Sequence, residues 1–391
     1  MGKGINNPIA ERVRKIPSSG IRKYFDLLTS MEGVISLGVG EPDVATPRHI
    51  SEAGIYAIEK GYTRYTSNYG MIELRQELAR HLRNRCGLDY DPYTELLITT
   101  GSSEALDLAM RAILNDGDEV IIPDPSYVAY MPCTVLAGGT FVPVPTCIEN
   151  DFKVEAAEIE KRVTERSRAI LVGYPNNPTG AVMDKAALTP IAEVARRHDL
   201  LVVSDEIYDR LVYGVEHTCF AALPEMQERT ILLGGFSKSY AMTGWRIGYA
   251  AAPAEIIEAM MTIHQYAMMC APVMGQMAAI EALRDGEDAL QEMLTNYDRR
   301  RRMIVKGLND IGLACFDPKG AFYAFPSIRS TGLTSEEFAE KLLMEEKVVV
   351  VPGSAFGACG EGYVRCCYAV ALPDIEEALE RMERFVQRHR T

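Results

Sequence analysis

Short apolar runs alternate with amphipathic segments through the middle of this 391-residue chain, and this alternation limits the folds open to it. Between two such runs, Leu106, Ala109, Met110 and Ile113 recur at helical spacing. Alternating strands and helices predict an α/β domain with a largely parallel sheet, whose active site lies at the carboxyl ends of the strands. The predicted strands are 96–100, 119–123, 140–144, 169–173, 200–204, 231–235 and 247–251.

The pattern changes after about residue 288, and a chain of this length exceeds one ordinary hydrophobic core. We predict a large domain at 46–288 and a smaller α+β domain formed by 1–45 together with 289–391. Four consecutive arginines at 299–302 are interpreted as the solvated face of a helix and not as a binding patch. The other elements predicted for the smaller domain are apolar runs at 321–326 and 348–351 and helices near 335–346 and 373–389.

Composition narrows the class of protein. Hydrophobic residues make up 47% of the chain, enough for a packed core, and the net charge of −13 disfavours nucleic acid or an anionic membrane as partner. Nine cysteines without a C-x-x-C pair or metal spacing indicate reduced thiols and a cytoplasmic protein. The adjacent Cys366 and Cys367 are predicted to be packing residues. Residues 1–8 lack the apolar core of a secretory signal, and no apolar stretch reaches the ~18 residues of a membrane span.

The strongest chemical signal is the segment 235–248, which reads GFSKSYAMTGWRIG. It places Lys238 just past a predicted strand, between Ser237 and an arginine, Arg246, eight positions on. Lysine is the side chain that forms a Schiff base with an aldehyde, and shielding from water makes its neutral amine accessible near pH 7. Arg246 and Ser237 supply a positive charge and a hydroxyl donor for a phosphate. Considered alone, Lys238 would be a surface lysine.

Other predicted strand ends carry polar side chains that suit the same cofactor. Residues 100–103, TGSS, lie between a strand and a helix start, so they could bind a phosphate or form a plain N-cap. Asn177 lies in PNNPTG, which could equally be a turn. Asp205, three positions before Tyr208, could pair with a protonated ring nitrogen or cap the next segment. Tyr127 could stack on a ring or serve packing.

Together these residues form the inventory for one phosphorylated pyridine aldehyde. With them, the chain closely resembles the class I and II aminotransferases of the fold type I pyridoxal-phosphate enzymes, the aspartate aminotransferase superfamily. The resemblance covers nearly the whole chain, from SLGVGEP at 36–42 to VRCCYA at 364–369. It implies a mostly parallel, mixed seven-stranded sheet flanked by helices, a smaller α+β domain from both termini, and a homodimer with shared active sites.

The resemblance also implies a role for each site residue. Lys238, Asp205 and Tyr208 would be catalytic: Lys238 as the Schiff-base lysine and general base, Asp205 as the partner of the pyridine nitrogen of pyridoxal 5′-phosphate. Arg365 would bind the substrate α-carboxylate in a two-pronged contact. The other implied contacts are Asn177 and Tyr208 at the 3-oxygen of the ring, Tyr127 stacked on it, Gly101, Ser102, Ser103, Ser237 and Arg246 at the phosphate, Gly40 and Asn177 at the substrate, and Tyr65 at the phosphate of the partner subunit.

The reaction implied is transfer of an α-amino group from an L-amino acid to a 2-oxo acid, with 2-oxoglutarate as acceptor and ping-pong kinetics. A β-lyase on the same fold stays open as an alternative, because it would share every cofactor residue. A cofactor-sensing regulator would need a DNA-binding module, and a nicotinamide dehydrogenase would need G-x-G-x-x-G after an early strand; the sequence has neither signature.

The donor amino acid is less constrained than the reaction. Ser103 stands where some bacterial aspartate aminotransferases of this subgroup have a lysine that serves the distal carboxylate of the substrate. The segment 266–272, YAMMCAP, which we place near the substrate side chain, is largely apolar. Both observations favour an aromatic or large aliphatic donor over aspartate.

Overall fold

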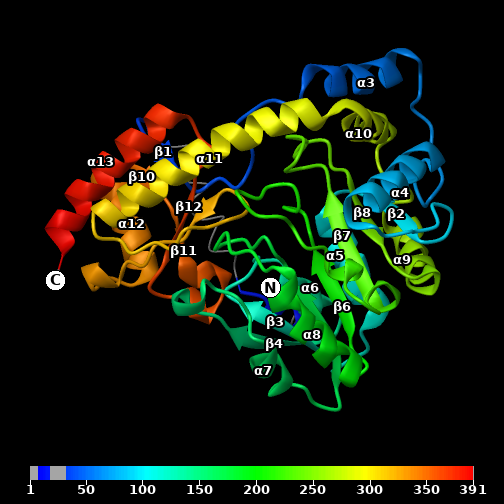
Figure 1. Ribbon diagram of the computed structural model, residues 1–391, viewed down its shortest axis with the longest axis horizontal. Coiled ribbons are helices and arrows are strands. Elements are labelled where there is room, and N and C mark those ends of the chain that lie inside the picture. Colours follow the sequence, from blue (N-terminus) through cyan, green and yellow to red (C-terminus); the bar gives the residue numbers. More distant parts are fainter. Residues whose placement is uncertain (1–7, 18–31, 391) are drawn as a thin grey trace, which may run out of the picture.

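A seven-stranded sheet forms the centre of the protein (Figure 1). The structure, a computed structural model, describes residues 8–17 and 32–390. Within these residues, one strand of the sheet, β8 (Gly248–Ala251), is antiparallel to both of its neighbours. The other six strands run in one direction. In order across the sheet the strands are β2 (Leu96–Thr99), β8 (Gly248–Ala251), β7 (Thr230–Gly235), β6 (Leu201–Asp205), β5 (Ser167–Val172), β3 (Glu119–Asp124) and β4 (Thr140–Pro145). The mostly parallel, mixed sheet is therefore confirmed.

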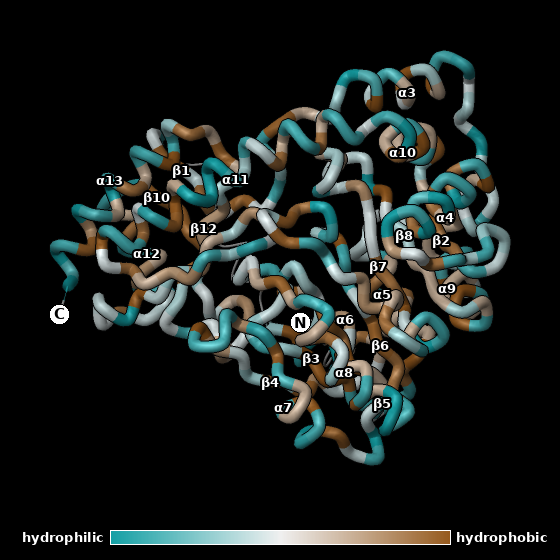
Figure 2. Tube along the Cα trace, viewed as in Figure 1, coloured by the Kyte–Doolittle hydropathy of each residue, from teal (hydrophilic) through white to brown (hydrophobic). Residues whose placement is uncertain are grey.

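Alternate side chains of each strand enter different cores, as the pleat requires. In β5, Ala169 and Leu171 join one core, whereas Ile170 and Val172 join another on the opposite face of the sheet. Figure 2 shows the resulting contrast between apolar strands and hydrophilic outer helix faces. The first face is covered by α5 (Ser102–Ile113), α6 (Tyr130–Leu136) and α9 (Ala254–Ala267), and the second by α4 (Ile72–Cys86), α8 (Lys185–Arg197) and α10 (Val273–Asp285).

A smaller group of strands and helices packs around a core of its own. Its helices are α11 (Glu287–Asp310), α12 (Ser335–Glu346) and α13 (Leu372–His389), of which α11 extends toward the large sheet in Figure 1. Its strands are β1 (Ile35–Ser36) paired with β10 (Val348–Val349), and an antiparallel sheet of β11 (Val351–Pro352), β12 (Val364–Cys367) and β9 (Tyr323–Ala324).

The proposed division of the chain into 46–288 and 1–45 with 289–391 stays a prediction, and residues 1–7 and 18–31 lie outside the described residues. None of the described helices is long and apolar enough to cross a lipid bilayer. The remaining helices are α1 (Glu11–Arg14), α3 (Arg48–Glu59) and α7 (Ala156–Glu160), with short 3₁₀ helices at Ile148–Asn150, Phe220–Ala222, Gln227–Arg229, Arg329–Thr331, Gly353–Phe356 and Ala358–Gly360.

The apolar run 321–326 contains the short strand β9 at Tyr323–Ala324. One expectation for the smaller domain needs correction. The arginine run is not a uniformly solvated face, because Arg301 is buried and forms ion pairs with Asp298 and Asp317. Helical periodicity turns one arginine in four toward the core, where acidic partners compensate its charge. Cys366 and Cys367 are fully buried in β12, in agreement with a packing role.

β8 packs so closely on the start of α5 that position 248 has no room for a side chain. A Cβ atom at Gly248 would lie 2.3 Å from the backbone nitrogen of Ser102 and 2.4 Å from the carbonyl carbon of Gly101. Gly248→Ala should therefore lower the free energy of unfolding by about 1–3 kcal/mol, since overpacking forces the backbone to shift. Chemical denaturation measures the change.

The chain offers a matched control for this substitution. A Cβ atom at Gly244 would meet nothing within 4 Å. Gly244→Ala should change the free energy of unfolding by less than about 0.5 kcal/mol, as exposed substitutions usually do. Equal effects of the two substitutions would contradict the claim that the contact between Gly248 and the α5 start limits the packing.

Candidate active site

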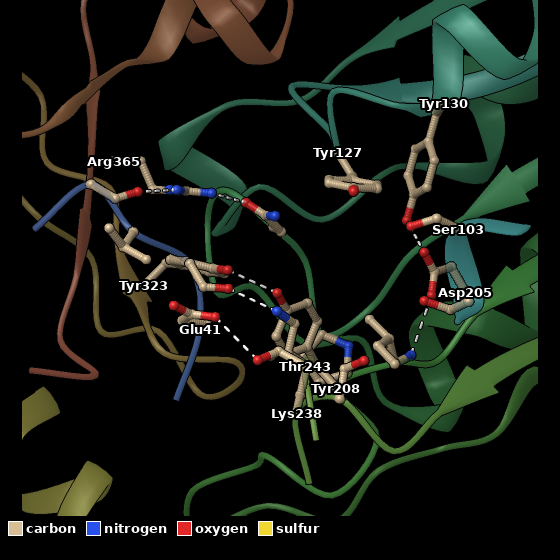
Figure 3. A pocket seen from close by; sticks show the side chains of 18 of the residues that line it. Glu41, Ser103, Tyr127, Tyr130, Asp205, Tyr208, Lys238, Thr243, Tyr323 and Arg365 are labelled. Carbon is tan, nitrogen blue, oxygen red and sulfur yellow. Dashed lines mark hydrogen bonds between the residues drawn. The ribbon is translucent and has the colours of Figure 1, made fainter. Parts of the chain in front are cut away.

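A pocket of about 400 Å³ lies at the carboxyl ends of the parallel strands, where the sheet meets the smaller domain. Figure 3 shows Asp205 and Arg365 at opposite sides of it, with Lys238 between them. The location agrees with the prediction from the strand–helix alternation. Of the predicted site residues, those that line the pocket are Gly40, Ser102, Ser103, Tyr127, Asn177, Asp205, Tyr208, Ser237, Lys238, Arg246 and Arg365.

Lys238 enters the pocket from the turn that follows β7. Its Nζ donates a hydrogen bond to the carbonyl of Gly40 at 2.7 Å and lies 5.8 Å from the centre of the Phe322 ring. Burial lowers the pKa of the Lys238 amine to about 8, because a charged ammonium loses hydration in this position. About a tenth of the amine is therefore neutral, and nucleophilic, at pH 7, a far larger share than an ordinary lysine has.

Asp205 is the last residue of β6 and is buried at the end of the pocket. Its carboxylate accepts hydrogen bonds from the hydroxyl of Tyr130 at 2.9 Å and from the backbone N–H of Ile207 at 3.2 Å. Burial raises the pKa of Asp205 to about 6, although both hydrogen bonds favour the ionised form. Tyr130 was not among the predicted site residues. The sequence held one sign of its role: Tyr130 lies three positions after Tyr127, a separation that places two side chains on the same face of a helical turn.

Two phenols meet beside the lysine. The hydroxyl groups of Tyr208 and Tyr323 lie 2.8 Å apart, within hydrogen-bonding distance. Tyr323 was also missed, because it belongs to an apolar run 115 positions after Tyr208 and nothing local in the sequence marks it as polar in function. Burial raises the pKa of Tyr208 well above its ordinary value, so both phenols keep their protons at neutral pH.

Arg365 is held at the side of the pocket opposite Asp205 (Figure 3). Its Nη1 donates to Oδ1 of Asn177 at 2.9 Å, and its Nη2 donates to the carbonyl of Gly38 at 2.7 Å. The guanidinium lies 4.4 Å from the centre of the Tyr323 ring and 4.9 Å from that of Phe356. Arg365 has no carboxylate partner within the described residues. This buried positive charge suits an incoming carboxylate.

A third part of the pocket collects donors for an anion. Gly101, at φ +81°, caps α5 and leaves room for Arg246, whose Nη2 would lie 2.4 Å from a Cβ atom at that position. Ser102 opens α5, so its hydroxyl lies at the positive end of the helix dipole. In the described part of the chain, no protein group hydrogen-bonds to the hydroxyls of Ser102 and Ser237. Gly101, which was predicted to contact the phosphate, is not among the residues that line the pocket.

Some predicted residues lie outside the pocket of this single chain. The side chain of Tyr65 is 80% exposed. The segment 266–272, expected near the substrate side chain, contributes nothing to the pocket lining, and Tyr266 is 86% exposed. The segment therefore lies outside the pocket that one chain forms, and its nearness to the substrate stays a prediction.

The residues present fit pyridoxal 5′-phosphate. Asp205 is a buried carboxylate with no cationic partner among the described residues, which suits a protonated ring nitrogen. The free serine hydroxyls, the α5 N-terminus and Arg246 suit a phosphate. Lys238 supplies the amine for an aldehyde. Within the described residues, no cluster of histidine, cysteine, aspartate or glutamate could hold a metal ion.

Comparison with known proteins agrees with this geometry. The family profile described as aminotransferase class I and II matches residues 32–382. The chain is 54% identical to the putative aminotransferase YugH of Bacillus subtilis, over 97% of this chain and 98% of that protein. It is 47% identical to aromatic-amino-acid aminotransferase 2 of Thermococcus litoralis and to an aspartate aminotransferase of Pyrococcus abyssi, each over 97% of this chain and 98% of the relative. A solved structure titled as Pyrococcus protein-A1 superposes with a TM-score of 0.95 at 47% identity, covering 97% of this chain and 98% of the other.

The lowered pKa of Lys238 can be measured on the chain freed of cofactor. Burial lowers the pKa of this amine to about 8, so its neutral fraction should rise as the pH passes through about 8. Labelling of Lys238 by a small amine-reactive reagent, followed by mass spectrometry, should show half-maximal rate near that pH. An ordinary lysine reaches it near pH 10.4. A midpoint above pH 10 would show that burial does not lower the pKa, and Lys238→Ala identifies the labelled peptide.

Proposed function

The chain belongs to the class I and II aminotransferases, and from that premise we propose that it moves the amino group of an aromatic or large aliphatic L-amino acid to 2-oxoglutarate. It is a pyridoxal-phosphate-dependent enzyme that transfers amino groups. The observation that supports this donor class most directly is the charge inventory of the pocket. The choice of 2-oxoglutarate rests on the family resemblance alone.

Three cationic side chains line the pocket in the described structure: Lys238, Arg246 and Arg365. Each has a task in the reaction that we propose. Lys238 reacts with the aldehyde, Arg246 binds the phosphate, and Arg365 binds the α-carboxylate. This leaves no cation for the distal carboxylate of an acidic donor, and Ser103 at the α5 start is neutral. Among the other lining residues, Val39, Pro175 and Ile207 offer apolar surface.

The names of the relatives do not decide the donor. The aromatic-amino-acid aminotransferase of Thermococcus litoralis and the aspartate aminotransferase of Pyrococcus abyssi are equally similar to this chain. The charge inventory therefore carries the proposal, and sequence identity does not. Two more expectations belong to it: a cytoplasmic location, favoured by nine cysteines that are all unpaired, and a homodimer whose subunits share active sites.

Each pocket residue has a definite task in the proposed mechanism. When bound, pyridoxal phosphate supplies an aldehyde and a protonated ring that draws electrons from the substrate Cα. The carboxylate of Asp205 holds the ring nitrogen protonated, and the hydroxyl of Tyr130 keeps that carboxylate ionised and oriented. The neutral Nζ of Lys238 takes the proton from the substrate Cα and later releases it.

The substrate is oriented at the other side of the pocket. Arg365 can present a planar fork to the α-carboxylate, and the contacts with Asn177 and Gly38 fix the plane of the guanidinium beforehand. A fixed plane directs the Cα–H bond of the substrate toward one side of the pocket, so less entropy is lost on the way to the transition state. Tyr208 and Tyr323 present two phenol groups at the 3-oxygen side of the ring in this proposal.

A donor screen on the purified enzyme tests the proposed substrate class. With 2-oxoglutarate as acceptor, kcat/KM for phenylalanine, tyrosine and leucine should exceed that for aspartate by about tenfold or more, since an unpaired carboxylate near apolar surface costs at least about 1.4 kcal/mol. Lys238→Ala is the control, and it should lose about 10²–10⁴-fold in turnover with every donor.

Two outcomes would contradict this proposal in different ways. A preference for aspartate would refute the charge argument and leave the amino transfer intact. Release of pyruvate from a β-thio amino acid in the absence of any 2-oxo acid would indicate the β-lyase alternative, which shares the cofactor residues.

The homodimer is supported by an unusual exposure of large apolar side chains. On and after α3, the exposed fractions of Ile55, Ile58, Tyr62 and Tyr65 are 52%, 58%, 46% and 80%. Several exposed large apolar side chains on one short segment are typical of a subunit interface. We propose that this face packs on a second copy of the chain and that Tyr65 reaches the phosphate of the partner's site. The exposed segment 266–272 would approach the same interface.

Hybrid dimers test the sharing of sites. Tyr65→Asp should inactivate by placing a carboxylate against the phosphate, and Lys238→Ala should inactivate by removing the base. If Tyr65 acts on the partner's site, a dimer of one mutant with the other contains one intact site and one doubly damaged site. Co-expressed and purified hybrids should then show about half of the wild-type activity per dimer, provided that the sites turn over independently. A verified hybrid without activity would mean that Tyr65 serves its own chain.

A further inference from the structure

A fully buried histidine lies outside the pocket and has no place in the mechanism above. His264, in α9, has no exposed surface, and its Nδ1 lies 2.7 Å from Oε1 of Glu104. A carboxylate can only accept, so Nδ1 carries the proton and donates it to Glu104. The hydrogen bond joins α9 to α5, the helix that begins at the proposed phosphate site.

The other oxygen of Glu104 reaches back to the loop before α5. Its Oε2 accepts the backbone N–H of Thr100 at 2.5 Å. Glu104 is the third residue of α5, so its carboxylate also interacts favourably with the helix dipole. One side chain therefore fixes Thr100, the first residue of the segment 100–103. Ser102 and Ser103, the first two residues of α5 and the end of the same segment, line the pocket.

His264 is itself held in place from the backbone side. Its carbonyl accepts the N–H groups of Met268 at 2.8 Å and Met269 at 3.0 Å, which end α9. These bonds fix the backbone of the last turn of α9, from which the imidazole reaches Glu104. A buried, charge-assisted hydrogen bond between two fixed elements restricts the loop more than an exposed one would.

We propose that His264 and Glu104 form a positioning pair that holds the segment 100–103, the turn before α5 and its first two residues, in the conformation that binds the phosphate of the cofactor. The inference rests on the proposed phosphate role of Ser102, Ser103, Ser237 and Arg246. Neither His264 nor Glu104 lines the pocket. The pair acts through the backbone of Thr100 and the start of α5, and so it affects the phosphate end of the cofactor and not the ring end.

A comparison of two ligands separates this role from general support of the fold. Pyridoxal 5′-phosphate carries the phosphate and pyridoxal lacks it, while both present the same ring and aldehyde. The dissociation constants of both should be measured by absorbance titration of the full-length chain freed of cofactor. In His264→Leu, the affinity for pyridoxal 5′-phosphate should fall about tenfold, a typical cost of leaving a buried charged group without its hydrogen bond. The affinity for pyridoxal should stay within about twofold.

The chain contains a chemically matched control pair. His217 Nε2 lies 2.7 Å from Oε2 of Glu206, and both side chains are buried. Glu206 follows Asp205 directly, at the ring end of the pocket, and its Oε1 accepts from Ser204 and from the N–H of Phe220. His217→Leu removes an equivalent hydrogen bond, yet it should leave the ratio of the two affinities unchanged.

Two further variants test the coupling itself. His264→Asn places an amide donor near the position of Nδ1 and should restore most of the preference for the phosphate form. Glu104→Ala should weaken binding of pyridoxal 5′-phosphate at least as much as His264→Leu. The double variant should be no worse than Glu104→Ala alone, because His264 acts only through that carboxylate. If His264→Leu does not fold, Glu104→Ala and His264→Asn carry the same measurement.

The outcomes distinguish this inference from the proposed function. The positioning role would be overturned if His264→Leu lost equal affinity for both ligands, or if the losses of the two single variants added up in the double variant. The phosphate site itself would still be upheld by a wild-type preference for pyridoxal 5′-phosphate over pyridoxal. A wild-type chain that binds pyridoxal as tightly as pyridoxal 5′-phosphate would overturn the phosphate site and this inference together.

Discussion

The parallel pairing of β5, β6 and β7 is the constraint on which the site depends. Val172 pairs with Ser204, and Asp205 pairs with Leu233, so the three strands end at the same edge of the sheet. Residues that follow these ends, among them Asn177 and Lys238, are thereby brought into one pocket although they lie 61 positions apart. The ladder hydrogen bonds and the fully buried strand side chains fix this edge before any ligand contributes.

Burial shifts the pKa values of Asp205 and Lys238 in opposite directions, and the two shifts are complementary. Burial raises the pKa of Asp205 to about 6 and lowers that of Lys238 to about 8. In both side chains it disfavours the charged form. A cation beside Asp205 would restore the ionised carboxylate, and an aldehyde needs the neutral amine that burial supplies. The pocket is therefore preorganised for a ligand that is cationic at one end and electrophilic near Lys238.

The sequence predicted the order of elements and most of the pocket, because both depend on local pattern. Strand limits follow from runs of apolar residues. Asp205 ends such a run, and Lys238 and Asn177 come a few positions after one. Tyr323 was not predicted because its partner comes from a distant strand end. The arginine run was misinterpreted for a related reason: charge patterning alone does not show that Arg301 turns inward, where acidic residues compensate it.

Two strongly exposed tyrosines, Tyr65 and Tyr266, lie outside the pocket that a single chain forms. Tyr65 and Tyr266 are among its most exposed aromatic side chains, although the resemblance and the apolar pattern associate both segments with the active site. Gln276 links these segments: fully buried in α10, it donates to Thr66 and to the carbonyl of Ala271. One buried amide thus fixes two exposed segments relative to each other. Because Gln276 ties the two segments together, they would lose less conformational entropy under a second surface than two independent segments would. The cofactor chemistry therefore depends on strand ends within one chain, whereas these two segments could contribute to a site only in the homodimer that we propose.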